Sequence, residues 1–165
     1  MRRALLAVTI VGLVMAPAAG ARTLPSLFAG QIRKIDAAAH APDVLLPRSM
    51  PLDAKRLYPN GGPTGSSYVL AIGVVKHCGG ADACFVAEFT ASKARTVFGK
   101  RVKVRGAAKA GFTPLSCGAS CAPPQIDFLV HGFRYTIQAN LKRTSQGDKA
   151  TLIAAAQAAI KAGPR

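Results

Sequence analysis

Short β-like runs separated by turn-forming residues fill the chain between residues 68 and 141, and this pattern limits its fold more than any other feature. The runs expected to be strands are YVLAIGVVKH at 68–77, ACFVAEFTA at 83–91, GKRVKVRG at 99–106, IDFLV at 126–130 and FRYTIQANL at 133–141. They alternate in polarity, as half-buried strands do. Short connections join antiparallel neighbours, whereas parallel strands need long crossovers. The pattern predicts an antiparallel sheet of about five strands.

Helical patterns flank this β-rich region. From Thr23 to about Ala39 the apolar residues recur at helical spacing, with Thr23 as a cap and Pro25 in the first turn. Packing on the sheet is favoured over contact with a membrane surface, because Asp36 and several alanines make this a weak interfacial helix.

A second helix is predicted after Asp148, a possible N-cap, and is stopped by Gly163-Pro164. Its buried stripe is expected to comprise Leu152, Ala156, Ala159 and Ile160, with Ile153 at the margin. Strands followed by one helix indicate an α+β fold, with an antiparallel sheet packed against an N-terminal and a C-terminal helix.

Residues 41–67 are expected to form an ordered but irregular connection. They contain five prolines and a GGPTG run, which disfavour regular structure. Apolar side chains such as Leu45 and Leu46 are expected to be tucked against the domain.

The first 21 residues have the pattern of a cleavable secretory signal. Arg2 and Arg3 precede an apolar run from Ala4 to Ala16, and Ala19-Gly20-Ala21 offers small residues for cleavage. The run is shorter than the roughly 20 residues that cross a bilayer. The sequence therefore predicts a signal peptide at 1–21 and a single exported domain at 22–165, periplasmic or secreted, with no transmembrane segment.

The four cysteines form two close pairs, Cys78 with Cys84 and Cys117 with Cys121. Sequence leaves three connectivities open, but local pairing is favoured because the intervening residues can form tight loops. A four-thiolate zinc site with His77 nearby is the alternative. Export and the absence of two-residue spacings favour disulfides.

A large excess of positive charge characterises the expected mature domain. Without Arg2 and Arg3 it carries 20 basic and 7 acidic residues, a net charge of +13. Such a charge favours acidic partners: an anionic envelope polymer, a lipid headgroup or an acidic protein. Nucleic acid is disfavoured because the chain is expected to be exported and few aromatics accompany the cations.

The basic stretch at 93–109 is the candidate binding surface, since it holds seven cations and no acid occurs from Thr90 to Ile126. On the expected strand, Val102 and Val104 would face inward. The candidate anion-binding residues are Lys100, Arg101, Lys103 and Arg105. Alternate residues of a strand are about 7 Å apart, a spacing suited to repeated phosphates or carboxylates. The alternative is a protective edge strand, where cations discourage aggregation.

No catalytic constellation is recognised, and no metal or cofactor is expected. Glu88, the sole glutamate, and Asp127 are the only candidate pair of carboxylates, and solvent exposure or pairing with Lys and Arg is the favoured alternative. A site formed by His40, His77 and His131 is disfavoured because all three are expected at strand ends, helix ends or turns.

The segment from Phe112 to Ile137 carries a distinctive motif, F-T-P-x-x-C-G-A-x-C-x-P-P followed by I-x-F and G-x-x-Y-x-I. Its residues are Phe112, Pro114, Cys117, Cys121, Pro123, Pro124, Ile126, Phe128, Gly132, Tyr135 and Ile137. The motif resembles that of small secreted bacterial proteins of unknown function, with Phe128 where a Trp is expected. The resemblance covers residues 42–162. It implies export and the α+β fold, and it brings no activity or ligand.

These features favour a non-enzymatic exported domain that binds an anionic envelope component through its basic strand. One alternative is a hydrolase of envelope polymers that uses Glu88 and Asp127. Another is a periplasmic partner-binding protein that uses the apolar loop around Leu45 and Leu46.

Overall fold

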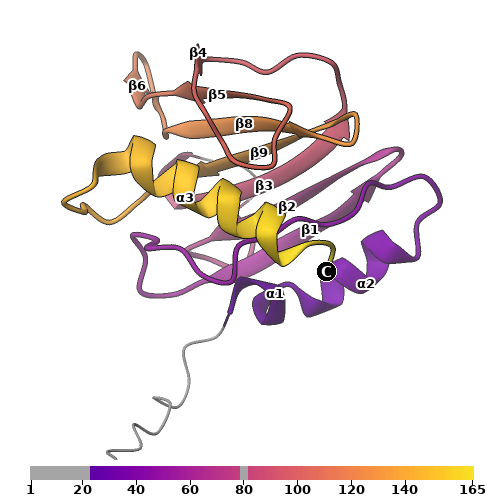
Figure 1. Ribbon diagram of the computed structural model, residues 1–165. Coiled ribbons are helices and arrows are strands. Elements are labelled where there is room, and N and C mark those ends of the chain that lie inside the picture. The colour runs from indigo at the N-terminus through magenta and orange to yellow at the C-terminus, as the bar shows by residue number, and fades with distance from the viewer. Residues whose placement is uncertain (1–22, 79–81) are drawn as a thin grey trace, which may run out of the picture.

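A twisted antiparallel sheet with helices on one side forms the structure, a computed structural model that describes residues 23–78 and 82–165 (Figure 1). The predicted signal peptide lies outside the described residues. The sheet has seven strands in the order β1-β2-β3-β9-β8-β5-β4, and neighbouring strands are antiparallel. Their bounds are β1 Tyr58–Thr64, β2 Ser67–Gly73, β3 Phe85–Lys93, β4 Lys100–Arg101, β5 Lys109–Thr113, β8 Gln125–Val130 and β9 Phe133–Ala139. The predicted α+β class is confirmed, with seven strands in place of about five.

Two of these strands were not expected from the sequence. β1 lies in the segment predicted to be irregular, and it tolerates Pro59 and Pro63 because it is an edge strand whose outer side needs no ladder hydrogen bonds. β5 was not among the five strands expected from the sequence. A side chain at its central Gly111 would collide with the carbonyl oxygen of Phe98, so the glycine admits a segment that crosses the sheet there.

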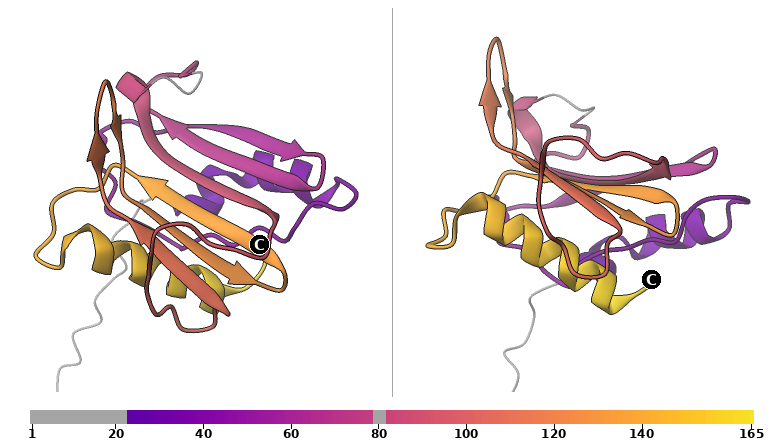
Figure 2. Two further views of the ribbon diagram at one scale, coloured as in Figure 1. Left: turned by 90° about the horizontal axis from the view of Figure 1, so that it is seen from above. Right: turned by 45° about the horizontal axis from the view of Figure 1, so that its top comes forward.

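The chain reverses between β8 and β9 through His131 and Gly132, as the sequence predicts. Both residues have positive φ, +50° and +81°, the conformation of the two-residue turns that match strand twist. A further small hairpin, β6 (Ser116–Cys117) and β7 (Cys121–Ala122), projects from the sheet between β5 and β8 (Figure 2).

The N-terminal helical region forms two short helices, α1 (Leu24–Leu27) and α2 (Ala29–Asp36), where one continuous helix was expected. Thr23 caps the first, accepting a hydrogen bond from the Ser26 N–H at 3.2 Å. The chain bends at Phe28, which is fully buried and packs edge-on against Phe89 of β3, their ring centroids 6.0 Å apart.

The C-terminal helix α3 spans Gly147–Ala162. The expected cap was wrong: Gln146 precedes the helix without a side-chain capping bond, and Asp148 lies in its first turn. The buried stripe consists of Leu152, Ala155, Ala156 and Ala159. Ile160, expected in this stripe, is only partly buried.

Residues 41–57 run in extended form between the helices and the sheet. Val44, Leu45, Leu46 and Leu52 are buried, as the sequence predicts for this segment. Two tyrosines of the sheet hold it: the Leu45 N–H donates to the Tyr68 hydroxyl at 3.4 Å, and the Tyr135 hydroxyl donates to the Asp43 carbonyl at 3.1 Å.

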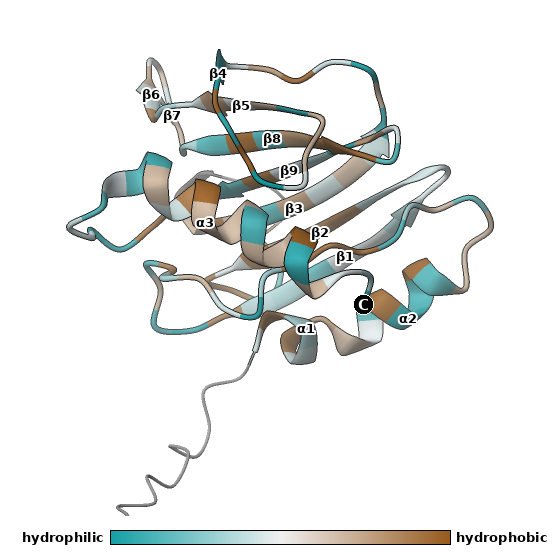
Figure 3. Ribbon diagram, viewed as in Figure 1, coloured by the Kyte–Doolittle hydropathy of each residue, from teal (hydrophilic) through white to brown (hydrophobic). Residues whose placement is uncertain are grey.

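The two faces of the sheet differ in their surroundings. The helices and the 41–57 segment pack on one side, here called the covered face (Figure 2). Core side chains of the sheet, the helices and this segment pack together there, and Figure 3 colours the hydrophobic positions along the strands and α3 brown. The other side is here called the open face. Its residues on the central strands include Val69, Ala71, Glu88, Thr90, Thr136, Gln138 and Asp127.

Candidate functional site: the basic edge

The four predicted anion-binding residues lie at one edge of the sheet. Lys100 and Arg101 form β4, and the expected strand ends there, whereas Lys103 and Arg105 follow in the connection to β5. All four are exposed, while Val104 is 5% exposed and belongs to the core. The predicted alternation of outward cations and inward valines is therefore present beyond the two paired residues.

A turn after Val104 anchors the connection to the helix. The Ala107 N–H donates to the Val104 carbonyl at 3.3 Å, and Gly106 has φ +87°. A Cβ on Gly106 would lie 2.7 Å from the Cγ2 of Ile160, so only glycine allows this approach to α3.

The close contact between Gly106 and α3 brings Lys161 near the other cations, which could not be predicted from the sequence. Lys161 of α3 and Arg105 line the same depression, of about 410 Å³. No local pattern connects Lys161 to the strand, because the two segments are more than 50 residues apart in the sequence. The turn at Gly106 is what brings them together.

Lys109 at the start of β5 completes the group. With Arg101 and Lys103 it lines a hollow of about 580 Å³ inside the β4–β5 connection. The name basic edge is used below for Lys100, Arg101, Lys103, Arg105, Lys109 and Lys161. All six are exposed.

The chain segment that carries five of the six basic-edge residues contains no carboxylate. The chain contains no Asp or Glu between residues 90 and 126. Asp148 lies in the first turn of α3 and Lys161 in the last, which are roughly 20 Å apart at 1.5 Å per residue. In the described residues no ion pair joins these six cations to a carboxylate. In the strand register the acid next to Arg101 is Asp127, two strands away across Gly111.

Asp127, expected to be solvent-facing or paired with a cation, is buried, with 1% exposure. Its carboxylate accepts hydrogen bonds from the Phe98 N–H at 2.9 Å, the Gln125 amide at 2.9 Å and the Thr136 hydroxyl at 2.7 Å. The expectation was wrong because the segment before β4 crosses the open face and covers Asp127. The Arg134 guanidinium of β9 lies 4.5 Å from the centre of the Phe98 ring and makes a second contact between this segment and the sheet.

Glu88 does not form a pair with Asp127. Both lie on the open face, but β9 separates their strands, so their Cα atoms are at least roughly 10 Å apart. Burial raises the pKa of the half-buried Glu88 carboxyl. The oxygens of Asp127 are occupied by the hydrogen bonds that hold the crossing segment.

The histidines are not brought together. His40 follows α2, His77 follows β2 and His131 lies in the β8–β9 turn, and all three are exposed. Among residues 23–78 and 82–165, no three His, Cys, Asp or Glu side chains are grouped as metal ligands.

Both cysteine pairs are local disulfides, as favoured from the sequence. Cys78–Cys84 links the end of β2 to the start of β3, with Cα atoms 5.6 Å apart. Cys117–Cys121 closes the β6–β7 hairpin, with Cα atoms 4.0 Å apart.

Comparison of the chain with protein-family models, curated proteins and solved structures found no match in any of the three. The resemblance based on the cysteine and proline motif therefore stays a prediction. None of the helices in the described part of the chain has the length and hydrophobicity to span a bilayer.

Proposed function

We propose that this protein is an exported, non-enzymatic domain that binds an anionic polymer of the cell envelope through its basic edge. One observation carries the proposal: six exposed cations from β4, its connection to β5, the start of β5 and α3 lie at one edge, with no carboxylate in the sequence from 90 to 126. Uncompensated cations at close spacing attract polymers with repeated negative charges.

The extent of the basic edge supports binding over edge protection. Protecting a sheet edge requires charges on the paired strand, which here is only Lys100 and Arg101. Lys103, Arg105 and Lys161 lie beyond the paired segment, and Lys103 and Lys109 line one hollow. An anionic ligand explains these additional cations.

The two alternative functions find less support. Glu88 and Asp127 lie on strands separated by β9, and the Asp127 carboxylate is sealed by three hydrogen bonds. Leu45 and Leu46 are 6% and 0% exposed, so the apolar loop lacks the exposed patch that a partner would need.

The decisive experiment compares two variants with the same change in charge. Arg101, Lys103 and Arg105 are replaced by Ser in the test variant, and binding is measured with polygalacturonate and with phosphatidylglycerol vesicles. Each cation near an anionic surface contributes about 1 kcal/mol, so the affinity should fall roughly a hundredfold. Wild-type binding should also weaken steeply with added salt.

The matched control replaces Arg56, Lys142 and Arg143, also two arginines and one lysine that are exposed. This variant should bind within about threefold of the wild type, because only long-range attraction is reduced. Equal losses in the two variants would assign binding to net charge and overturn the assignment to the basic edge. Stronger binding to polygalacturonate than to vesicles would identify a polymer rather than a lipid as the ligand.

A further inference from the structure

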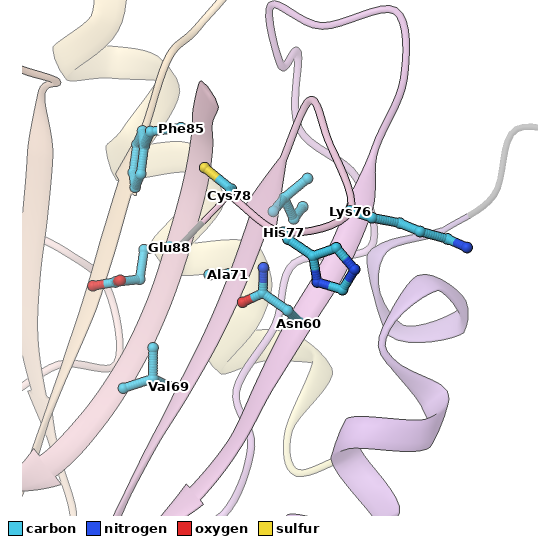
Figure 4. A pocket seen from close by; sticks show the side chains of 9 residues that line it. Asn60, Val69, Ala71, Lys76, His77, Cys78, Phe85 and Glu88 are labelled. Atoms are coloured by element: carbon cyan, nitrogen blue, oxygen red, sulfur yellow. The ribbon is translucent and has the colours of Figure 1, made fainter. Parts of the chain in front are cut away.

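A hollow of about 440 Å³ lies on the open face over β1, β2 and β3, at the opposite side of the sheet from the basic edge (Figure 4). Its apolar lining includes Val69, Ala71 and Phe85, and polar groups come from Asn60, Glu88 and His77. An apolar surface with a few convergent polar groups is typical of small-molecule sites.

The strand register explains the hollow. Asn60 of β1 pairs with Ala71 of β2, which pairs with Glu88 of β3, so the three side chains form one row across the sheet. Ala71 has only a methyl group, so the middle of this row is a depression between the longer side chains of Asn60 and Glu88. Asn60 and Glu88 stand on either side, roughly 10 Å apart at their Cα atoms.

Glu88 is unusual in this chain because it is the sole glutamate. It is half-buried, and no hydrogen bond or ion pair satisfies its carboxylate within the described residues. Burial raises its pKa, because desolvation disfavours the charged carboxylate. Asp127, on the same face, has three donors. A ligand that donates hydrogen bonds would give Glu88 the partners it lacks.

The charges around the hollow limit the ligand. Glu88 disfavours an anion, whereas exposed Lys76 at the lining and the large positive net charge of the chain disfavour a cation. A neutral ligand with hydroxyl groups avoids both penalties. A carboxylate accepts hydroxyl hydrogens, and an amide both donates and accepts. The carbon–hydrogen face of a sugar ring can pack on Val69, Ala71 and Phe85.

We propose that this hollow binds a neutral saccharide unit, with Glu88 and Asn60 holding hydroxyl groups on either side of Ala71. The site is independent of the proposed function, because it shares no residue with the basic edge and needs no charge on the ligand.

NMR titration of the purified protein with cellotriose and triacetylchitotriose, both uncharged, tests the proposal. Putrescine serves as the cationic comparison. A saturable shift of the Val69, Ala71 and Phe85 amides with a sugar, insensitive to salt, is expected at millimolar concentration. Shifts with putrescine alone, or no saturable shift with either sugar, would overturn the proposal.

Two variants inside the hollow and one control outside it test the site. Glu88→Gln keeps the shape but removes the charged acceptor, and roughly tenfold or greater loss of affinity is expected. Ala71→Phe fills the centre of the row and should abolish binding. Ser92→Ala, on the same strand and face as Glu88 but outside the hollow, should leave the affinity unchanged.

The pH dependence gives a readout that a structural role would not produce. Wild-type affinity should fall as the pH drops through the raised pKa of Glu88, because protonation removes the charged acceptor. The Glu88→Gln variant should show no such change over the same range. If the affinity of both proteins fell equally with pH, Glu88 would not be part of the binding site. Retained sugar binding in the basic-edge variant would show that the two sites are separate.

Discussion

Successive side chains of each strand point alternately to the covered face and to the open face. The two faces differ in the interactions that these side chains make. On β3, Phe89 packs under Phe28 in a nearly closed apolar layer, while its neighbours Glu88 and Thr90 point to the other side. The covered face is closed by apolar contacts with α1, α2, α3 and the 41–57 segment. On the open face, the polar side chains beneath the segment before β4 form hydrogen bonds, and the side chains elsewhere contact solvent.

Asp127 shows how the open face differs from an ordinary solvent-exposed surface. The crossing segment before β4 shields it, and three donors satisfy its carboxylate. At the other side of the same face, Glu88 has no such donors in the described chain and borders a hollow. One carboxylate thus holds a segment of the chain, whereas the other borders a hollow.

The largest expected effect is on the free energy of unfolding, and it should differ between two adjacent residues of β3 that point to opposite faces. Phe89→Ala should lower the free energy of unfolding by about 3–5 kcal/mol, because a fully buried ring leaves a cavity. Thr90→Ala should change it by less than about 0.5 kcal/mol. Urea unfolding of both variants measures the contrast. Similar losses would mean that the open face is buried in solution.

Asp127→Ala should have the next largest effect, about 2–3 kcal/mol, because the Phe98 N–H and the Thr136 hydroxyl lose their acceptor. Hydrogen exchange of the Phe98 amide should accelerate as the crossing segment loosens. Exposed Asp53 provides the control, and Asp53→Ala should be near neutral. Unchanged exchange at Phe98 would show that Asp127 does not hold the segment.

The tyrosines of the covered face predict a loss of stability at alkaline pH. Burial raises the pKa of Tyr135 from 10.0 to about 12 and also raises the pKa of Tyr68. Between about pH 10 and 12 the unfolded phenol ionises while the folded one stays neutral, so stability is full below pH 10 and falls as the pH rises. Tyr135→Phe should reduce the slope of stability against pH. An unchanged slope would assign the loss to other groups.

The smallest expected effect concerns the basic edge. Replacing Arg101, Lys103 and Arg105 by Ser should alter the free energy of unfolding by less than about 0.5 kcal/mol, because all three are exposed and lack carboxylate neighbours in sequence. Thermal unfolding of this variant and of the Arg56, Lys142 and Arg143 control provides the measurement. A large destabilisation here would show that the basic edge has a structural role.

Much of the fold could be predicted from local patterns. Four of the five expected strands correspond to β2, β3, β8 and β9, whose apolar residues alternate strongly. The two helical regions, the reversal at His131-Gly132 and both local disulfides also followed from spacing and turn chemistry. In these segments the local preference and the tertiary environment agree.

The missed elements depend on neighbours that are distant in sequence. β1 has a poor strand sequence, and it forms because β2 provides a pairing partner along its length. β5 contains Gly111 where Phe98 crosses, and β4 has only two residues before the connection that approaches α3 at Gly106. The strand and helix preferences of individual residues do not predict contacts between segments that are distant in sequence.

The candidate sites divide in the same way. The sequence alone determined the charge of the basic edge, its freedom from carboxylates between residues 90 and 126, and the alternation that exposes Arg101 and Lys103. Only the tertiary structure decided that Lys161 joins it, that Asp127 is sealed, and that Ala71 leaves a hollow beside Glu88. The physical reason is that charge and periodicity are local properties of the chain, whereas burial and proximity arise when distant segments pack and pair in register.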